Sequence, residues 1–211
     1  GLGSVFAEDL ARLGVRRLVL VDGDRLEASN LNRWQGATPA DIGTSKAHLL
    51  ARRIRAMVPE AKVRAVPHAL EDPRSLLAIA GADAIVGGVD NDEARWLINH
   101  EALQYLQPYF DAGVVIRASP AVDFLGRYFA VIPGVTGCAE CKSYTLIDRD
   151  AVVAGFANPA VSAERRAAGY VLDAPGVAAP SAYPLNQRTA SLAIQEILNF
   201  AAGWRPLATV I

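Results

Sequence analysis

The sequence contains little cysteine and no long apolar run. Its 211 residues include only two cysteines, too few for the disulfide framework that holds many small secreted domains together. No uninterrupted apolar stretch approaches the roughly 20 residues that a membrane-spanning helix needs, and no basic segment followed by an apolar one opens the chain. These absences argue against a secreted or membrane-spanning protein, and we expect a cytoplasmic one.

An excess of charge of either sign is also lacking. The chain carries 21 lysines and arginines against 22 aspartates and glutamates, for a net charge of −1. Because proteins that bind nucleic acid or anionic membranes usually carry a basic excess, we expect neither as a partner. Hydrophobic residues make up 52% of the chain, which is typical of a globular domain with a large core and excludes a disordered chain.

Apolar runs alternate with helical patterns along the first half of the chain. Buried strands are predicted at 18–21, 84–86 and 109–115 with a weaker one at 62–66, and helices at 4–13, 44–58, 73–80 and 92–107. Thr44 is the expected N-cap of the second helix, and Asp72 followed by Pro73 is typical of the start of the third. Asp92 is the favoured cap of the fourth helix, and Arg95 within that helix is expected to form a structural ion pair. This alternation predicts an α/β fold, a doubly wound, Rossmann-like and mainly parallel sheet.

The pattern changes after residue 115. Residues 116–132 predict two extended strands joined by a turn near Gly126, which would add an antiparallel extension to the sheet. Prolines and glycines then interrupt the periodicity through residues 137–183, so we expect a long crossover excursion there. A helical pattern returns at 185–202.

Gly1-Leu2-Gly3-Ser4 precedes the first helical pattern. Glycines let main-chain N–H groups approach a phosphate at a helix N-terminus, although Phe6 stands where the full dinucleotide fingerprint has a third glycine. Asp22 ends the next strand, where a carboxylate can accept hydrogen bonds from ribose hydroxyls. A glycine loop of this kind normally follows a buried strand, and residues 207–211 resemble the start of another, so we expect a segment of a longer protein.

Three further segments extend the nucleotide-binding pattern: Ser29-Asn30-Leu31-Asn32-Arg33, Gly43-Thr44-Ser45-Lys46 and Asp90-Asn91. Together with Asp22 and Asp24 they match, in order and approximate spacing, the motifs D-x-D, S-N-L-x-R, G-x-x-K and D-N. Each motif is weak alone, but four in register over almost one hundred residues are specific. The chain therefore resembles the adenylating enzymes that activate ubiquitin-like proteins, namely the E1-type enzymes and the bacterial ThiF, MoeB and HesA proteins.

The resemblance implies that the chain binds ATP with Mg²⁺ and adenylates the C-terminal carboxylate of a small ubiquitin-like or sulfur-carrier protein. Its implied residue roles are a phosphate loop at Gly1, Gly3 and Ser4, ribose binding by Asp22, phosphate contacts from Asn30, Arg33 and Lys46, Mg²⁺ binding by Asp90, and Asn91 beside the nucleotide. The catalytic residues would be Arg33, Lys46 and Asp90. It further implies a homodimer and one domain over 1–211, divided into a nucleotide-binding half, 1–115, and a partner-tail and dimer half, 116–211.

Cys138 and Cys141 form a C-x-x-C motif, which in a cytosolic protein indicates a metal or redox site. The resemblance implies a structural Zn²⁺, with the remaining ligands beyond Ile211. The alternative is that one thiol carries the activated substrate as a thioester or acyl disulfide.

Two other functions fit parts of the sequence. An NAD-dependent oxidoreductase would use the glycine loop and Asp22, but it leaves Arg33, Lys46 and Asp90 without a role. An inactive subunit with a role in assembly would need none of these charged residues. A nucleotide-binding panel separates the first alternative from an adenylating enzyme.

Overall fold

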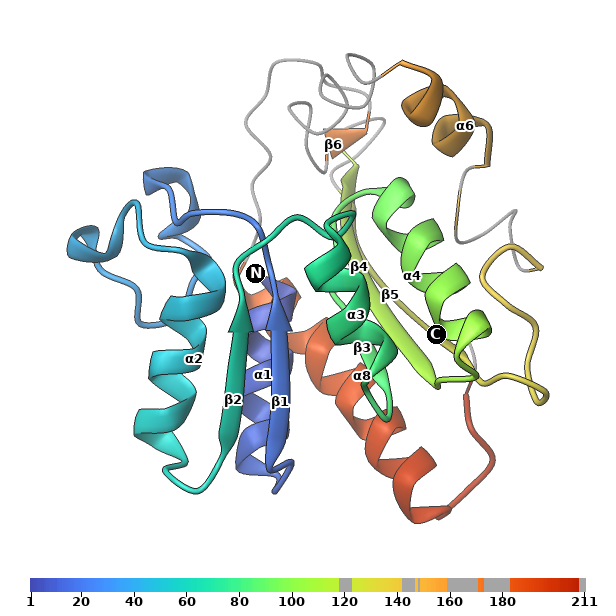
Figure 1. The fold of residues 1–211 in the computed structure, drawn as a ribbon, viewed down its shortest axis with the longest axis horizontal. Helices are drawn as coiled ribbons and strands as arrows, with labels where there is room; N and C mark the ends of the chain where they lie inside the picture. The colour runs from blue at the N-terminus through green and yellow to red at the C-terminus, as the bar shows by residue number, and fades with distance from the viewer. Residues whose placement is uncertain (118–122, 142–146, 148, 159–170, 173–182, 209–211) are drawn as a thin grey trace. The chain divides into compact units, whose positions relative to one another are not determined.

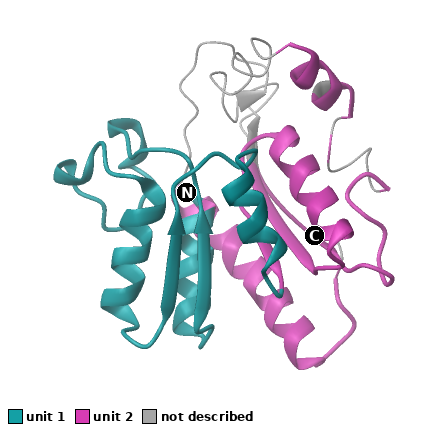
Figure 2. Cartoon of the chain, in the orientation of Figure 1, with its two compact units in different colours: residues 1, 3–83 teal, residues 2, 84–211 magenta. Residues whose placement is uncertain are grey.

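The computed structural model describes residues 1–117, 123–141, 147, 149–158, 171–172 and 183–208. The chain forms two compact units, residues 1 and 3–83 in the first and residues 2 and 84–211 in the second (Figure 2). Each unit combines helices with parallel strands, which confirms the predicted fold class. The expected functional division at residue 115 stays a prediction, because it concerns what each half binds. Within the described residues, no helix is both long and apolar enough to cross a membrane.

The first unit is built on two parallel strands (Figure 1). Strand β1 (Arg17–Val21) pairs with β2 (Lys62–Val66), and helices α2 (Lys46–Met57) and α3 (Pro73–Ala80) contact both strands. The core joins apolar side chains of α2 and β2 to helix α1 (Leu2–Arg12), and Leu26 and Trp34 are buried among them. The loop between β1 and α2 contains two 3-10 helices, η1 (Ala28–Asn30) and η2 (Pro39–Asp41).

Side-chain caps set where the helices of this unit begin. Helix α3 begins as predicted, because the Asp72 side chain accepts a hydrogen bond from the Arg74 N–H, and Gly81 follows its last residue. The predicted cap of α2 was wrong by one position, since Ser45 caps this helix by accepting from the His48 N–H. The carbonyl of Thr44 instead accepts a hydrogen bond from the Leu26 N–H at 2.8 Å.

The second unit contains a mixed sheet. Strand β3 (Ile85–Gly87) runs parallel to β4 (Tyr109–Arg117), and β5 (Asp123–Val131) runs antiparallel to β4. An antiparallel extension is therefore confirmed, but one strand, β5, stands where two were predicted within 116–132. The short β6 (Val171–Leu172) pairs parallel with β4. The helices are α4 (Asp92–Gln104), α6 (Arg149–Ala157) and α8 (Tyr183–Ala202), and much of the predicted excursion at 137–183 lies outside the described residues.

Helices α4 and α8 pack on opposite faces of β4. Successive side chains of a strand point to opposite faces. The ring of Phe110 contacts that of Phe200 in α8, with centroids 5.4 Å apart, whereas the next residue, Asp111, forms an ion pair with Arg95 in α4 at 2.8 Å. Burial on both faces explains why the sequence of β4 is an almost continuous apolar run.

The predicted turn near Gly126 was wrong. Gly126 lies inside β5, where it pairs with Val114. A Cβ built on Gly126 would lie 2.2 Å from the Thr189 hydroxyl oxygen of α8. The glycine therefore allows a helix to pack closely against the strand, which is a regular use of glycine within a sheet.

Candidate functional site

The glycine loop lies at the start of α1. The Gly1 nitrogen is 3.4 Å from the Arg33 carbonyl oxygen, and the Ser4 hydroxyl donates to the Gly1 carbonyl at 2.8 Å. Apart from its chain neighbours and the backbone of its own helix, no atom of the described chain comes within 4 Å of a Cβ built on Gly3. Packing therefore does not require glycine at this position, and its small size leaves room at the helix N-terminus for a phosphate group.

Asp22 and Lys46 come together through the loop that follows β1. Lys46 Nζ lies 2.8 Å from Asp24 Oδ2, and the Lys46 N–H donates to the Asp24 carbonyl at 2.9 Å. Asp22 Oδ1 accepts from the Asp24 N–H at 2.9 Å. Burial raises the pKa of Asp22, while this hydrogen bond and the charge of Lys46 oppose the rise. These contacts link the first turn of α2 to the loop at the C-terminal end of β1.

Arg33 ends a compact turn that Asn30 holds together. Asn30 is buried, its side-chain oxygen accepts from the Glu27 N–H at 3.2 Å, and its carbonyl accepts from the Arg33 N–H at 3.1 Å. The half-exposed Arg33 guanidinium donates to the Ser29 carbonyl at 2.8 Å. The sequence did not indicate this loop-fixing role of Asn30, whose predicted phosphate contact stays a prediction.

The charged residues of the first unit converge on the glycine loop. The positive charges of Arg33 and Lys46 both act on the Gly1 nitrogen, which lies 3.4 Å from the Arg33 carbonyl oxygen. The carboxylate of Asp22 opposes them. The structure therefore brings together these four predicted residues, with Ser4 at the same helix start. Two cations beside a helix N-terminus favour a polyanionic ligand.

A separate hollow of about 490 Å³ opens on the loops that follow β1 and β2. It is lined by Gly23, Arg25, Gly43, Thr44, Ser45, His48 and Pro67. The lining includes none of the residues predicted to bind the nucleotide. The predicted site is therefore identified by its charged side chains and not by this hollow.

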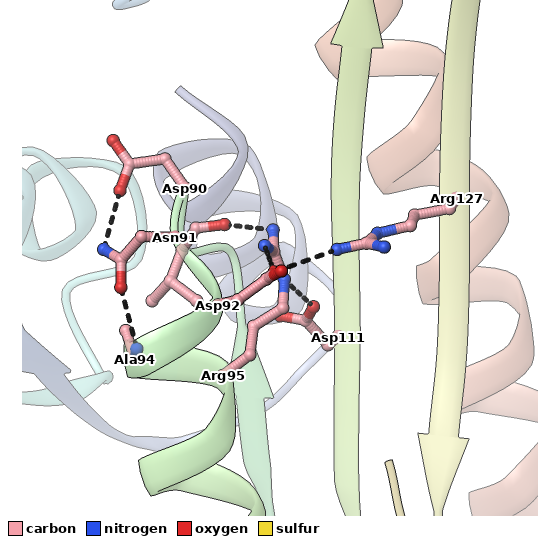
Figure 3. A network of polar contacts seen from close by, with 8 residues as sticks. Asp90, Asn91, Asp92, Ala94, Arg95, Asp111 and Arg127 are labelled. Atoms are coloured by element: carbon pink, nitrogen blue, oxygen red, sulfur yellow. Dashed lines mark hydrogen bonds and ion pairs between the residues drawn. The ribbon is translucent and has the colours of Figure 1, made fainter. Parts of the chain in front are cut away.

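Asp90 and Asn91 belong to the second unit, directly after β3 (Figure 3). Asn91 caps α4 by accepting from the Ala94 N–H at 2.8 Å, and its Nδ2 donates to Asp90 Oδ1 at 3.2 Å. The side chain of Asp90 is exposed. The sequence favoured Asp92 as the cap, and this was wrong because Arg95 engages the Asp92 carboxylate at 3.2 Å. The predicted contact of Asn91 with the nucleotide stays a prediction.

A buried charged pair lies beneath this loop. The side chains of Arg95 and Asp111 are 5% and 0% exposed, and Arg95 Nε lies 2.8 Å from Asp111 Oδ2. Burial raises the pKa of Asp111, and the Arg95 charge opposes that rise. The sequence suggested an ion pair for Arg95 but did not identify Asp111 as its partner. The signal was an acidic residue inside the apolar run 109–115.

Cys138 and Cys141 lie in a turn that is anchored on α4. Their sulfur atoms are 3.3 Å apart, and the Cys141 N–H donates to Cys138 Sγ at 3.4 Å. The residues between them attach the turn to the helix. The Ala139 N–H donates to Asn99 Oδ1 at 2.9 Å, and Glu140 accepts from the Trp96 side chain at 2.9 Å. The thiols are therefore held in a fixed turn.

The two sulfur atoms lie closer together than two thiolate ligands of one Zn²⁺ would. Two thiolates bound to one Zn²⁺ at about 2.3 Å lie roughly 3.8 Å apart, whereas the sulfur atoms of Cys138 and Cys141 are 3.3 Å apart. Burial alone would raise the pKa of Cys138, but hydrogen bonds from the N–H groups of Cys141 and Glu140 lower it overall, which favours the thiolate. Across the described residues, no group of three His, Cys, Asp or Glu side chains is placed to hold a metal. Further zinc ligands would have to come from elsewhere.

Comparison with known proteins gives consistent matches. The sequence profile of the ThiF family matches residues 1–210. The chain is 36% identical over 153 residues to the NEDD8-activating enzyme E1 catalytic subunit of Arabidopsis thaliana, covering 68% of this chain and 33% of that protein. It is 31% identical over 164 residues to the sulfur carrier protein ThiS adenylyltransferase of Bacillus subtilis, covering 76% and 47%. The chain thus spans a third to a half of the length of these relatives.

Solved structures share the fold. The structure of E. coli MccB with ATP superposes with a TM-score of 0.71 at 21% identity, covering 99% of this chain and 55% of that one. PaaA superposes with a TM-score of 0.69 at 19% identity, covering 100% and 66%. At these identities the likeness concerns the fold alone, and it agrees with the predicted Rossmann-like architecture.

Proposed function

The chain belongs to the ThiF family, and from this premise we propose that it binds ATP with Mg²⁺ and adenylates the C-terminal carboxylate of a small ubiquitin-like or sulfur-carrier protein. The names of its relatives, an E1 catalytic subunit and a sulfur carrier protein adenylyltransferase, support this class of reaction. The observation that carries the proposal is the convergence of Arg33, Lys46 and Asp22 on the glycine loop.

The reaction transfers an adenylyl group to a carboxylate. A carboxylate oxygen of the partner protein forms a bond to the α-phosphorus of ATP. The bond from this phosphorus to the oxygen that bridges to the β-phosphate breaks, and its electron pair leaves with pyrophosphate. Negative charge therefore grows on the leaving group, and Arg33 and Lys46 are the cations that would stabilise it. Asp22 would accept hydrogen bonds from the ribose hydroxyls.

The ammonium group of Lys46 is restrained by a neighbouring carboxylate. Its ion pair with Asp24 at 2.8 Å fixes the ammonium group, and the side chain of Lys46 is only 20% exposed. A cation that is already in place needs little reorganisation when charge develops on the phosphates, which is the condition for effective electrostatic catalysis. Asp24 would thus position Lys46 without contacting the nucleotide.

Asp90 is proposed to bind Mg²⁺. Its exposed carboxylate suits this hard cation, which prefers oxygen ligands, and Asn91 holds one of the carboxylate oxygens at 3.2 Å. Mg²⁺, when bound, neutralises charge on the phosphate oxygens. Cys138 and Cys141 are proposed to hold a structural Zn²⁺ together with ligands from outside the described residues, and the family resemblance suggests a homodimer.

The test uses the full-length protein. ATP with Mg²⁺ should stabilise it, by about 2.7 kcal/mol when the ligand is at 100 times its Kd, whereas NAD should not. Asp90→Ala should abolish pyrophosphate exchange that depends on the carrier protein encoded nearest to its gene. Arg33→Ala and Lys46→Ala should each slow exchange by roughly 10²-fold. Their effects should not multiply, because the two cations act on one phosphate chain.

Arg74→Ala is the matched control for the loss of a cation. Arg74 is exposed and pairs with Asp72 at the start of α3, so its removal should leave exchange unchanged. Stabilisation by NAD but not by ATP would contradict the proposal. Near-normal exchange in a folded Asp90→Ala variant would contradict the proposed role of Asp90, whereas no exchange by the wild-type protein would favour an assembly role.

A further inference from the structure

The guanidinium group of Arg95 links the loop before α4 to strand β4 (Figure 3). Arg95 Nε lies 2.8 Å from Asp111 Oδ2 in β4, and Nη1 lies 3.2 Å from Asp92 Oδ1. Its Nη2 donates to the Val89 carbonyl. Arg95 therefore contacts the residue before Asp90 and the second residue after it, and its position is fixed by a carboxylate on a different element.

The surrounding backbone makes room for this network at two glycines. A Cβ built on Gly87 would lie 2.4 Å from Asp111 Oδ1, and one built on Gly113 would lie 2.9 Å from Arg95 Nη2. No other residue type fits at either position without displacing the charged pair. The pair is therefore part of the fold of this sheet and not a chance contact.

Stability alone does not account for such a pair. Two charges removed from water lose much of their hydration, and well-packed apolar residues often replace a buried ion pair without loss of stability. What a charged pair provides and an apolar pair does not is a directional link to polar groups. Here these groups are the Val89 carbonyl and the Asp92 carboxylate, which Arg127 also approaches at 3.7 Å.

The segment held in this way carries Asp90. On its N-terminal side the Val89 carbonyl is fixed by Arg95, and on its C-terminal side Asn91 caps α4 through the Ala94 N–H. The backbone at Asp90 is therefore restrained from both sides, while its side chain is exposed. This is the arrangement expected of a ligand that must be presented in one orientation.

We propose that Arg95 and Asp111 are positioning residues that hold the 89–92 segment in the conformation in which Asp90 binds Mg²⁺. The inference rests on the proposed role of Asp90 as a Mg²⁺ ligand. Neither positioning residue touches the metal. If loss of the pair lowers the fraction of molecules with the competent loop conformation to about one tenth, the apparent affinity for Mg²⁺ falls about tenfold.

The experiment measures ATP affinity by calorimetry on the full-length protein, once with saturating Mg²⁺ and once with EDTA. The ratio of the two affinities reports on the metal site alone. Asp111→Asn keeps the shape of the side chain but removes its charge. Arg95→Lys keeps the charge, but a single ammonium group cannot reach the three partners of the guanidinium at once. Circular dichroism sets a temperature at which each variant is folded.

Glu196→Gln is the matched control. Glu196 is also a buried carboxylate of the second unit, 2% exposed, and it pairs with Arg205. Loss of the Glu196 charge should lower the stability of the protein but leave the ratio of ATP affinities with and without Mg²⁺ at the wild-type value. Asp111→Asn and Arg95→Lys should lower this ratio about tenfold with unchanged affinity for metal-free ATP, and Asp90→Asn should bring it near one.

The outcomes separate this inference from the function on which it rests. The positioning role is overturned if folded Asp111→Asn and Arg95→Lys show the wild-type ratio of ATP affinities with and without Mg²⁺ while the ratio of Asp90→Asn falls to near one. That result leaves the proposed function intact. A ratio near one in the wild type, or a normal ratio in Asp90→Asn, overturns the role of Asp90 and the inference with it. An equal loss in Glu196→Gln shows a general effect of stability and also overturns the inference.

Discussion

Gly87 offers a direct test of how tightly the buried network is packed. It ends β3 and pairs with Asp111 of β4. A Cβ at this position would lie 2.4 Å from Asp111 Oδ1 and 3.0 Å from a ring carbon of Tyr109. Asp111 cannot move away easily, because its other oxygen is held by Arg95 at 2.8 Å. Gly87→Ala should therefore introduce steric strain.

The expected magnitude follows from two opposing effects. The φ angle of Gly87 is not positive, so alanine can adopt the backbone conformation and should gain about 0.5–1 kcal/mol from the lower entropy of its unfolded chain. Overpacking of a buried site costs about 1–3 kcal/mol. The net loss should lie between about 0 and 2.5 kcal/mol with a midpoint near 1 kcal/mol, which for a protein of this size lowers the Tm by roughly 3 °C.

Urea unfolding followed by circular dichroism measures this loss and identifies its cause. The cost of Gly87→Ala should fall by about 1 kcal/mol or more when Asp111 is already alanine, because the nearest clashing atom is then absent. Gly81→Ala serves as the control, since its added Cβ would lie 3.7 Å from the Leu77 carbonyl, an ordinary contact. If the cost of Gly87→Ala is the same in both backgrounds, the packing described here is incorrect.

Two further predictions concern other groups. Burial raises the folded-state pKa of Asp22, so its favourable contribution to stability is present below the unfolded pKa of about 3.9 and is lost as the pH rises through the raised value. Asp22→Asn should therefore stabilise the ATP-free protein at pH 7 but not at pH 3, while weakening ATP binding; equal unfolding curves at pH 7 would refute this. Cys138→Ser should lower both the zinc content and the stability of the full-length protein if the thiols bind zinc. Unchanged stability of a metal-free variant that has lost transfer activity would instead favour a nucleophilic thiol.

Much of the fold could be predicted because its signals are local. The ends of α3 follow from Asp72, Pro73 and Gly81, which satisfy the helix termini within a few residues of chain. The strand β4 follows from an uninterrupted apolar run, because a strand covered on both faces needs apolar side chains at every position. The candidate nucleotide residues could be recognised because each motif occupies a short segment at a strand end.

The predictions that were wrong concerned residues whose partners are not visible in the local sequence. Gly126 was expected in a turn, because nothing nearby shows that Thr189 of α8 packs against it. Asp92 was expected to cap α4, but the charge of Arg95 draws its carboxylate and leaves the cap to Asn91. A side chain with two possible partners takes the one that gives the stronger interaction, and local sequence shows only one of them.

Sequence patterns were sufficient to predict the α/β fold class, the family and the set of residues proposed to bind ATP. These depend on periodicity and on short motifs, which do not change with the packing of distant elements. The pairing of Lys46 with Asp24, and that of Asp111 with Arg95 next to the loop that carries Asp90, could be seen only in the folded protein. Such pairings depend on which elements become neighbours, and that is set by burial of the core as a whole.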